Sequence, residues 1–170
     1  CRELCTLMDV PLIFDEVTSG FRENIGGYHM RLGVEPDICL FGKTISNGVP
    51  MAAMVGRSKI LKRSESSFIS STYWTDRIGP AAALATIKRM IAINSPQRLI
   101  SDGTFIKNIL SEAALKNKLT ISFDSQISTM SFSLDVNDWR KTLTLYTQEM
   151  LKRGILSSDR IYANCAHSLS

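Results

Sequence analysis

Two residues of opposite charge, an acid and a lysine, each follow a short apolar run. Asp15 ends the run LIFD, and Lys43 follows the run ICLFG, 28 positions further along the chain. Polar side chains at the carboxyl ends of buried strands are typical of sites in α/β folds. A carboxylate there can hold a positively charged ring nitrogen, but as an isolated feature Asp15 is equally well explained as a helix cap or a surface ion pair.

The same residues invite a comparison with nucleotide-binding loops. An apolar run before Asp-Glu is also typical of the magnesium-binding strand of P-loop ATPases, and FGKT at 41–44 superficially suggests a phosphate loop. The loop pattern GxxxxGK[ST] requires glycine at position 37, where Asp37 stands. Gly48 and Pro50 then interrupt the helix whose N-terminus would bind phosphate. The sequence therefore argues against an ATPase.

Three segments instead resemble the signatures of class III aminotransferases, which use pyridoxal 5'-phosphate (PLP). They are LIFDEVTSGFR at 12–22, GGYHMRLGVEPD at 26–37 and PDICLFGKTISNGVPMAAMVGR at 36–57. The middle segment is most similar to glutamate-1-semialdehyde aminomutases and their relatives. The resemblance extends over all 170 residues and is weakest after about Asn94.

The resemblance implies a role for each of three residues. Asp15 would pair with the pyridinium nitrogen of PLP, Val17 would pack on the face of its ring, and Lys43 would bind it as a Schiff base. The chemistry of these residue types agrees. PLP acts as an electron sink while its ring nitrogen stays protonated, which a neighbouring carboxylate favours, and a lysine supplies the imine and then moves protons.

A threonine after the lysine segment reaches the cofactor phosphate in this family, commonly that of the partner subunit. SSTYWTDRIGPAAALA at 70–85 matches that place, and Thr72 is the candidate. The family usually continues with serine, glycine and histidine or asparagine, whereas Trp74 and Thr75 follow here. Thr75 is therefore an alternative. Arg77 would recognise an acidic substrate group or form a structural ion pair.

Two further polar residues, Arg22 and His29, lie in the connection between the acid and the lysine. They are candidates for lining the substrate entrance. Single polar residues in a loop are more often simply solvated, and the sequence does not choose between these roles.

Short strands and an alanine-rich helix must position these residues. Pro11 to Phe14 has the pattern of a strand buried on both faces of a parallel sheet. Apolar runs at 38–41 and 51–55 predict two more strands, and the composition from Pro80 onward predicts a buried helix with proline in its first turn. The segment before Pro11 is typical of the last turns of a helix.

The alanine-rich helix is interrupted at Asn94, Ser95 and Pro96, and the sequence after them predicts a different arrangement of helices and strands. We expect helices at 99–115 and 138–153, with apolar runs at 119–123 and 127–134. The prediction is a fold type I PLP-dependent transferase. Residues 1–95 would form part of a PLP-binding large domain, a mostly parallel α/β sheet with helices on both faces, and 96–170 part of a smaller α+β domain.

Composition excludes several other classes of protein. Hydrophobic residues make up 44% of the chain and charged residues 21%, as in ordinary globular domains. The formal net charge of +4 is carried by scattered Lys and Arg, so nucleic acid is not expected as a partner. No apolar run has the roughly 20 residues of a membrane span, and the four cysteines and two histidines lack metal-site spacing. A cytoplasmic location without a metal is the default.

The resemblance implies amino-group transfer between a small-molecule amine and a carbonyl compound by a homodimeric enzyme. An intramolecular 2,1 shift of the amino group, as in the aminomutases, is the first alternative, and a non-catalytic or truncated relative is the second. The chain begins at Cys1 and stops at Ser170, and both ends are interpreted as cut. We expect these residues to be inactive alone, because the family binds phosphate partly through an earlier segment.

Overall fold

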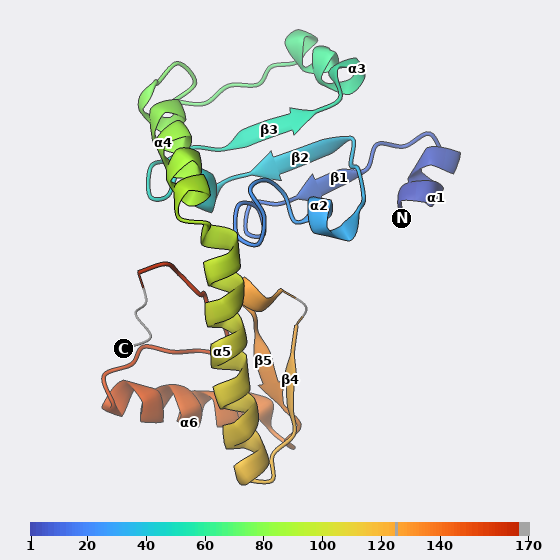
Figure 1. The fold of residues 1–170 in the computed structure, drawn as a ribbon. Coiled ribbons are helices and arrows are strands. Elements are labelled where there is room, and N and C mark those ends of the chain that lie inside the picture. The colour runs from blue at the N-terminus through green and yellow to red at the C-terminus, as the bar shows by residue number, and fades with distance from the viewer. Residues whose placement is uncertain (125, 167–170) are drawn as a thin grey trace. The chain divides into compact units, whose positions relative to one another are not determined.

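The structure, a computed structural model, describes residues 1–124 and 126–166 (Figure 1). The chain divides into two compact units, Cys1–Pro96 and Gln97–Ser170. No helix among the described residues has both the length and the apolar composition that crossing a bilayer requires.

The first unit is built on a small sheet with the strand order β1 (Ile13–Asp15), β2 (Ile38–Phe41) and β3 (Ala53–Gly56). The predicted strands are confirmed at their places, with boundaries that differ by up to two residues. β1 and β2 are parallel, and β3 pairs with β2 in antiparallel register after the connection at 42–52, which includes the short helix η1 (Lys43–Ile45). The carboxyl ends of β1 and β2 therefore meet at one edge.

The prediction that β1 is buried on both faces is wrong for this chain. Phe14 is half-buried, but Ile13 is 54% exposed and Asp15 is exposed as well. Among the described residues β1 pairs with β2 alone, which leaves β1 at the edge of this sheet. An apolar pattern reports the tendency of a strand to be covered, and only the folded chain shows which face is covered.

Short helices connect the strands, and α4 packs against the sheet. The alanine-rich segment predicts α4 well, and Asp76 Oδ1 accepts a hydrogen bond of 2.8 Å from the Ile78 N–H at its start. The core cluster joins the sheet, the connection after β1 and α4: Phe21, Cys39, Phe41, Ile45, Ala83 and Met90. The helical elements are α1 (Arg2–Leu7), α2 (His29–Leu32), η1 (Lys43–Ile45), α3 (Ser58–Leu61), η2 (Lys62–Ser66) and α4 (Ile78–Ala92).

The second unit is an α+β arrangement. Its elements are α5 (Ser95–Lys116), β4 (Ile121–Phe123), η3 (Ile127–Thr129), β5 (Phe132–Leu134) and α6 (Trp139–Lys152), with β4 and β5 antiparallel. The helix break near Asn94 is confirmed, since Asn94 has a φ of 49° and α5 begins at the next residue. The predicted run at 127–134 is not one strand, because η3 interrupts it before β5.

Candidate functional site

Asp15 and Lys43 lie at the same edge of the first sheet. Asp15 is the last residue of β1 and pairs in register with Leu40 of β2, while Lys43 follows the end of β2 as the first residue of η1. Because β1 and β2 are parallel, their carboxyl ends meet at this edge. Both side chains are exposed, so the edge presents a carboxylate and an amine to a ligand.

The backbone at Lys43 adopts an uncommon conformation. Lys43 has a φ of 47°, in the left-handed region that few residues with a side chain adopt. Such conformations cost about 1 kcal/mol or more and cluster at functional sites. Gly42 precedes it in an extended conformation, and a Cβ at Gly42 would lie 3.2 Å from Val17 Cγ1. Val17 therefore packs directly on the backbone that presents the lysine.

Asp15 is held by its own turn. Its Oδ1 accepts a hydrogen bond of 3.1 Å from the backbone N–H of Val17. Among the described residues its Oδ2 has no hydrogen-bond partner. One carboxylate oxygen is thus fixed by the backbone, and the other is available to a donor outside the described chain.

Sequence reasoning did not single out Glu16, which organises the connection between β1 and β2. Glu16 is 2% exposed, and its carboxylate accepts hydrogen bonds from Ser19 Oγ at 2.6 Å, Tyr28 N at 2.7 Å and His29 N at 2.8 Å. His29 Nδ1 lies 2.9 Å from the same carboxylate. Burial opposes ionisation of this carboxyl, but the hydrogen bonds outweigh burial and hold the pKa of Glu16 below its ordinary value.

Arg22 and His29, the two candidates for the substrate entrance, contact other residues of the first unit. His29 Nδ1 contacts Glu16 and lies 3.5 Å from Cys39 Sγ, and Arg22 Nε donates a hydrogen bond of 2.6 Å to the Thr18 carbonyl. These contacts explain both side chains as supports of the connection. Burial, followed by the charge of Glu16, raises the pKa of the Cys39 thiol, so this cysteine behaves as part of the core.

The predicted phosphate contact lies in a separate exposed segment. Thr72 and Thr75 occupy one turn at 72–75, directly before α4, and among the described residues neither side chain has a hydrogen bond. Arg77 stands at the N-cap position of α4 and has no ion pair with the described residues. The assignment of Thr72, with Thr75 as its alternative, stays a prediction.

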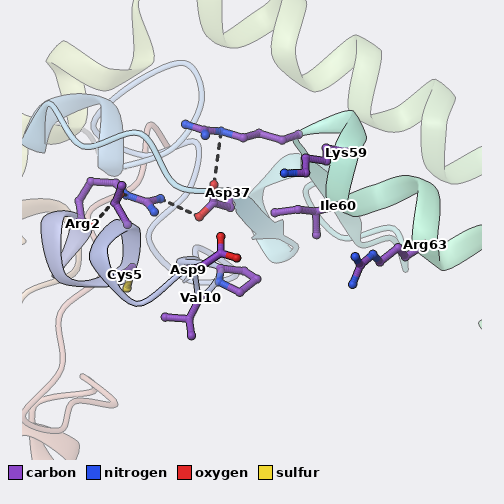
Figure 2. Close-up of a pocket in the computed structure, with 11 residues that line it drawn as sticks. Arg2, Cys5, Asp9, Val10, Asp37, Lys59, Ile60 and Arg63 are labelled. Atoms are coloured by element: carbon purple, nitrogen blue, oxygen red, sulfur yellow. Dashed lines mark hydrogen bonds and ion pairs between the residues drawn. The ribbon is translucent and has the colours of Figure 1, made fainter.

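A cavity of about 370 Å³ lies elsewhere, around Asp37 at the amino end of β2 (Figure 2). Arg2 Nη1 lies 2.7 Å from Asp37 Oδ2 and Arg57 Nε 3.4 Å from Asp37 Oδ1. The Leu12 N–H, which donates to the same carboxylate at 2.8 Å, and then Arg2 hold the pKa of Asp37 below its usual range. The carboxylate ties α1 and the ends of β1 and β3 together, and the cavity contains none of the predicted site residues.

Solved structures that are similar to this chain show its class of fold. The FumI protein of Sphingopyxis sp. MTA144, solved in its PLP internal aldimine form, matches with a TM-score of 0.90 at 22% identity, over 99% of this chain and 41% of its own. The chain therefore has the fold of type I PLP-dependent transferases, of which it represents a part.

The sequence comparisons identify the family. The family model for class-III aminotransferases matches residues 1–130, and the chain belongs to this family. It is 41% identical to 3-aminobutyryl-CoA aminotransferase of Cloacimonas acidaminovorans over 88 residues, which are 51% of this chain and 21% of the relative. It is 32% identical to glutamate-1-semialdehyde 2,1-aminomutase of Nitratidesulfovibrio vulgaris over 168 residues, 91% of this chain and 39% of the relative. The chain thus spans less than half the length of these relatives.

Proposed function

We propose that the complete protein containing this chain is a PLP-dependent aminotransferase that moves an amino group between a small-molecule amine and a carbonyl compound. The observation that carries the proposal is the placement of Asp15 and Lys43 at the carboxyl ends of two adjacent parallel strands. Membership of the class-III aminotransferase family supports it.

The residues at this edge fit the cofactor. The exposed Lys43 Nζ would hold it covalently, Asp15 Oδ2 would accept a hydrogen bond from its protonated ring nitrogen, and Val17 would cover a ring face. Thr72 would bind its phosphate, with Thr75 as the alternative. Bound PLP supplies an electron sink for the bonds of the substrate carbon that carries the amino group.

Asp15, Lys43 and Val17 would each have a different role in the reaction. Asp15 would keep the ring nitrogen protonated, because a negative charge beside that nitrogen favours its charged form. Lys43 Nζ, once the substrate amine has displaced it from the cofactor, would move a proton between the substrate carbon and the cofactor, which requires a neutral amine that can approach both atoms. Val17, which packs against the backbone of Gly42, would cover one face of the bound ring.

The proposal also covers the domain boundaries, the oligomeric state and the cellular location of the protein. Residues 1–95 would be part of the large, cofactor-binding domain and 96–170 part of the small domain. The active protein would be a homodimer, since the resemblance assigns the threonine of one subunit to the phosphate of the other. Its location would be cytoplasmic.

An intramolecular 2,1-aminomutase is a second candidate. It is favoured by the relative from Nitratidesulfovibrio vulgaris, whose similarity extends over 91% of this chain. A mutase moves the amino group within one molecule and needs no separate acceptor. Turnover of an amine that depends on an added keto acid would support the aminotransferase, and isomerisation of glutamate-1-semialdehyde without any acceptor would support the mutase.

Borohydride reduction of the complete protein with bound PLP, followed by peptide mapping, tests the attachment site. We expect the pyridoxyl label on Lys43, while Lys59 and Lys62 serve as internal controls because they lie in α3 and η2, which do not follow the carboxyl ends of β1 and β2. A label on either control lysine, with Lys43 unmodified, would contradict the proposal. The absence of any label would favour a non-catalytic relative.

A further inference from the structure

The amine of Lys43 is held by a residue that has no assigned role. Lys43 Nζ donates a hydrogen bond of 2.5 Å to Thr18 Oγ1, in the connection that follows β1. Lys43 is otherwise exposed, and exposed lysine side chains lose much rotamer entropy when they are fixed. A single short contact with a hydroxyl therefore determines where this amine stands.

Thr18 is itself held in place. Its carbonyl accepts a hydrogen bond of 2.6 Å from Arg22 Nε. The turn around it is closed by the Gly20 N–H, which donates to the Glu16 carbonyl at 2.8 Å, and the Glu16 N–H donates to Leu40 of β2 at 2.9 Å. The hydroxyl is thus presented from a turn that is bound to the neighbouring strand.

We infer that Thr18 is a positioning residue that holds Lys43 Nζ at the carboxyl edge of the sheet until the cofactor attaches. The inference rests on the proposed function, because it takes Lys43 as the residue that attaches PLP. An amine held against Thr18 Oγ1, in the turn that directly follows Val17, meets an incoming carbonyl more often than one that samples solvent. Without the hydroxyl, the exposed lysine samples many rotamers.

The test measures two rates on the complete protein freed of cofactor. The first is acetylation of Lys43 by limiting acetic anhydride, followed by mass spectrometry with Lys59 as internal reference. The second is attachment of saturating PLP, followed by absorbance. In Thr18→Val, acetylation should rise roughly two- to tenfold, because a hydrogen bond no longer has to break, and PLP attachment should fall by a similar factor because orientation is lost.

Two variants separate the hydroxyl from general disturbance. Thr18→Ser retains the acceptor and should restore both rates. Thr44→Val is the matched control, because Thr44 adjoins Lys43 but its side chain has no hydrogen bond within the described residues. It should behave as the unmodified protein.

Each outcome is decisive. Unchanged acetylation in Thr18→Val, or an equal rise in Thr44→Val, would show that the hydroxyl does not hold the amine. PLP attachment that is unchanged or faster in Thr18→Val would show that the contact only restrains the lysine and does not position it. If the unmodified protein took up no PLP on Lys43, the proposed function would fail, while acetylation would still report whether Thr18 holds the amine.

Discussion

Replacing Glu16 with glutamine should loosen the connection that carries Val17 and Thr18. In the structure Oε2 of Glu16 accepts the Tyr28 N–H, and Oε1 accepts the His29 N–H. An amide has one acceptor oxygen and one NH₂ donor. Whichever way the amide turns, one of the two backbone N–H groups faces a donor and loses its acceptor.

The magnitude follows from this count. A buried donor left unsatisfied costs about 1–3 kcal/mol, and the bonds that remain lose the strengthening that the negative charge provides. The expected cost of opening this connection is about 2–4 kcal/mol, a large fraction of the roughly 5–15 kcal/mol by which proteins are stable. Amide hydrogen exchange at Tyr28 and His29 should accelerate roughly 30- to 1,000-fold if these amides open locally.

A matched control is Glu35→Gln. The Glu35 side chain is 82% exposed, and its ion pair with Arg57 at 3.7 Å is worth less than about 1 kcal/mol. Exchange at Tyr28 and His29 should not change in this variant. Unaltered exchange at both amides in Glu16→Gln would refute the view that the buried carboxylate holds the connection.

The pH dependence provides a second measure of the same carboxylate. Because the folded protein lowers the pKa of Glu16, the stabilisation is present above the pKa of the unfolded chain and is lost as the pH falls through the folded value. Protection of Tyr28 and His29, corrected for intrinsic exchange rates, should therefore decline in acid. In Glu16→Gln this contribution should be absent.

Three further experiments have defined outcomes. Asp15→Asn should lower turnover about ten- to a hundredfold while cofactor binding changes less, since the charge rather than the shape is removed; unchanged turnover would exclude Asp15 as the ring-nitrogen partner. Of Thr72→Ala and Thr75→Ala, only the first should weaken PLP binding, about tenfold or more by equilibrium titration, and the reverse result would transfer the role to Thr75. Gly103→Ala should destabilise the second unit by about 1–3 kcal/mol, because its Cβ would lie 2.4 Å from the Ile127 carbonyl oxygen; thermal melting against Ser101→Ala, an exposed position in α5, measures this.

Local patterns in the sequence were sufficient to predict β2 and α4 and to select Asp15 and Lys43 as candidate site residues. The run at Ile38–Phe41 predicts β2 to the residue, and the alanine-rich segment predicts α4 within two residues. Both follow from side-chain periodicity and propensity, which act within a few residues of the chain. Asp15 and Lys43 were candidates because the first ends an apolar run, the second follows another, and both belong to motifs that resemble those of the class III aminotransferases.

Contacts between distant positions were decided only by the tertiary structure. Glu16 looks like the second acid of a pair, yet its partners Tyr28 and His29 stand 12 and 13 positions away. Thr18 meets Lys43 across 25 positions, and the exposure of Ile13 depends on which face of β1 is covered. A hydrogen bond needs its two atoms within about 3 Å, and residue type alone does not state which backbone path brings them there.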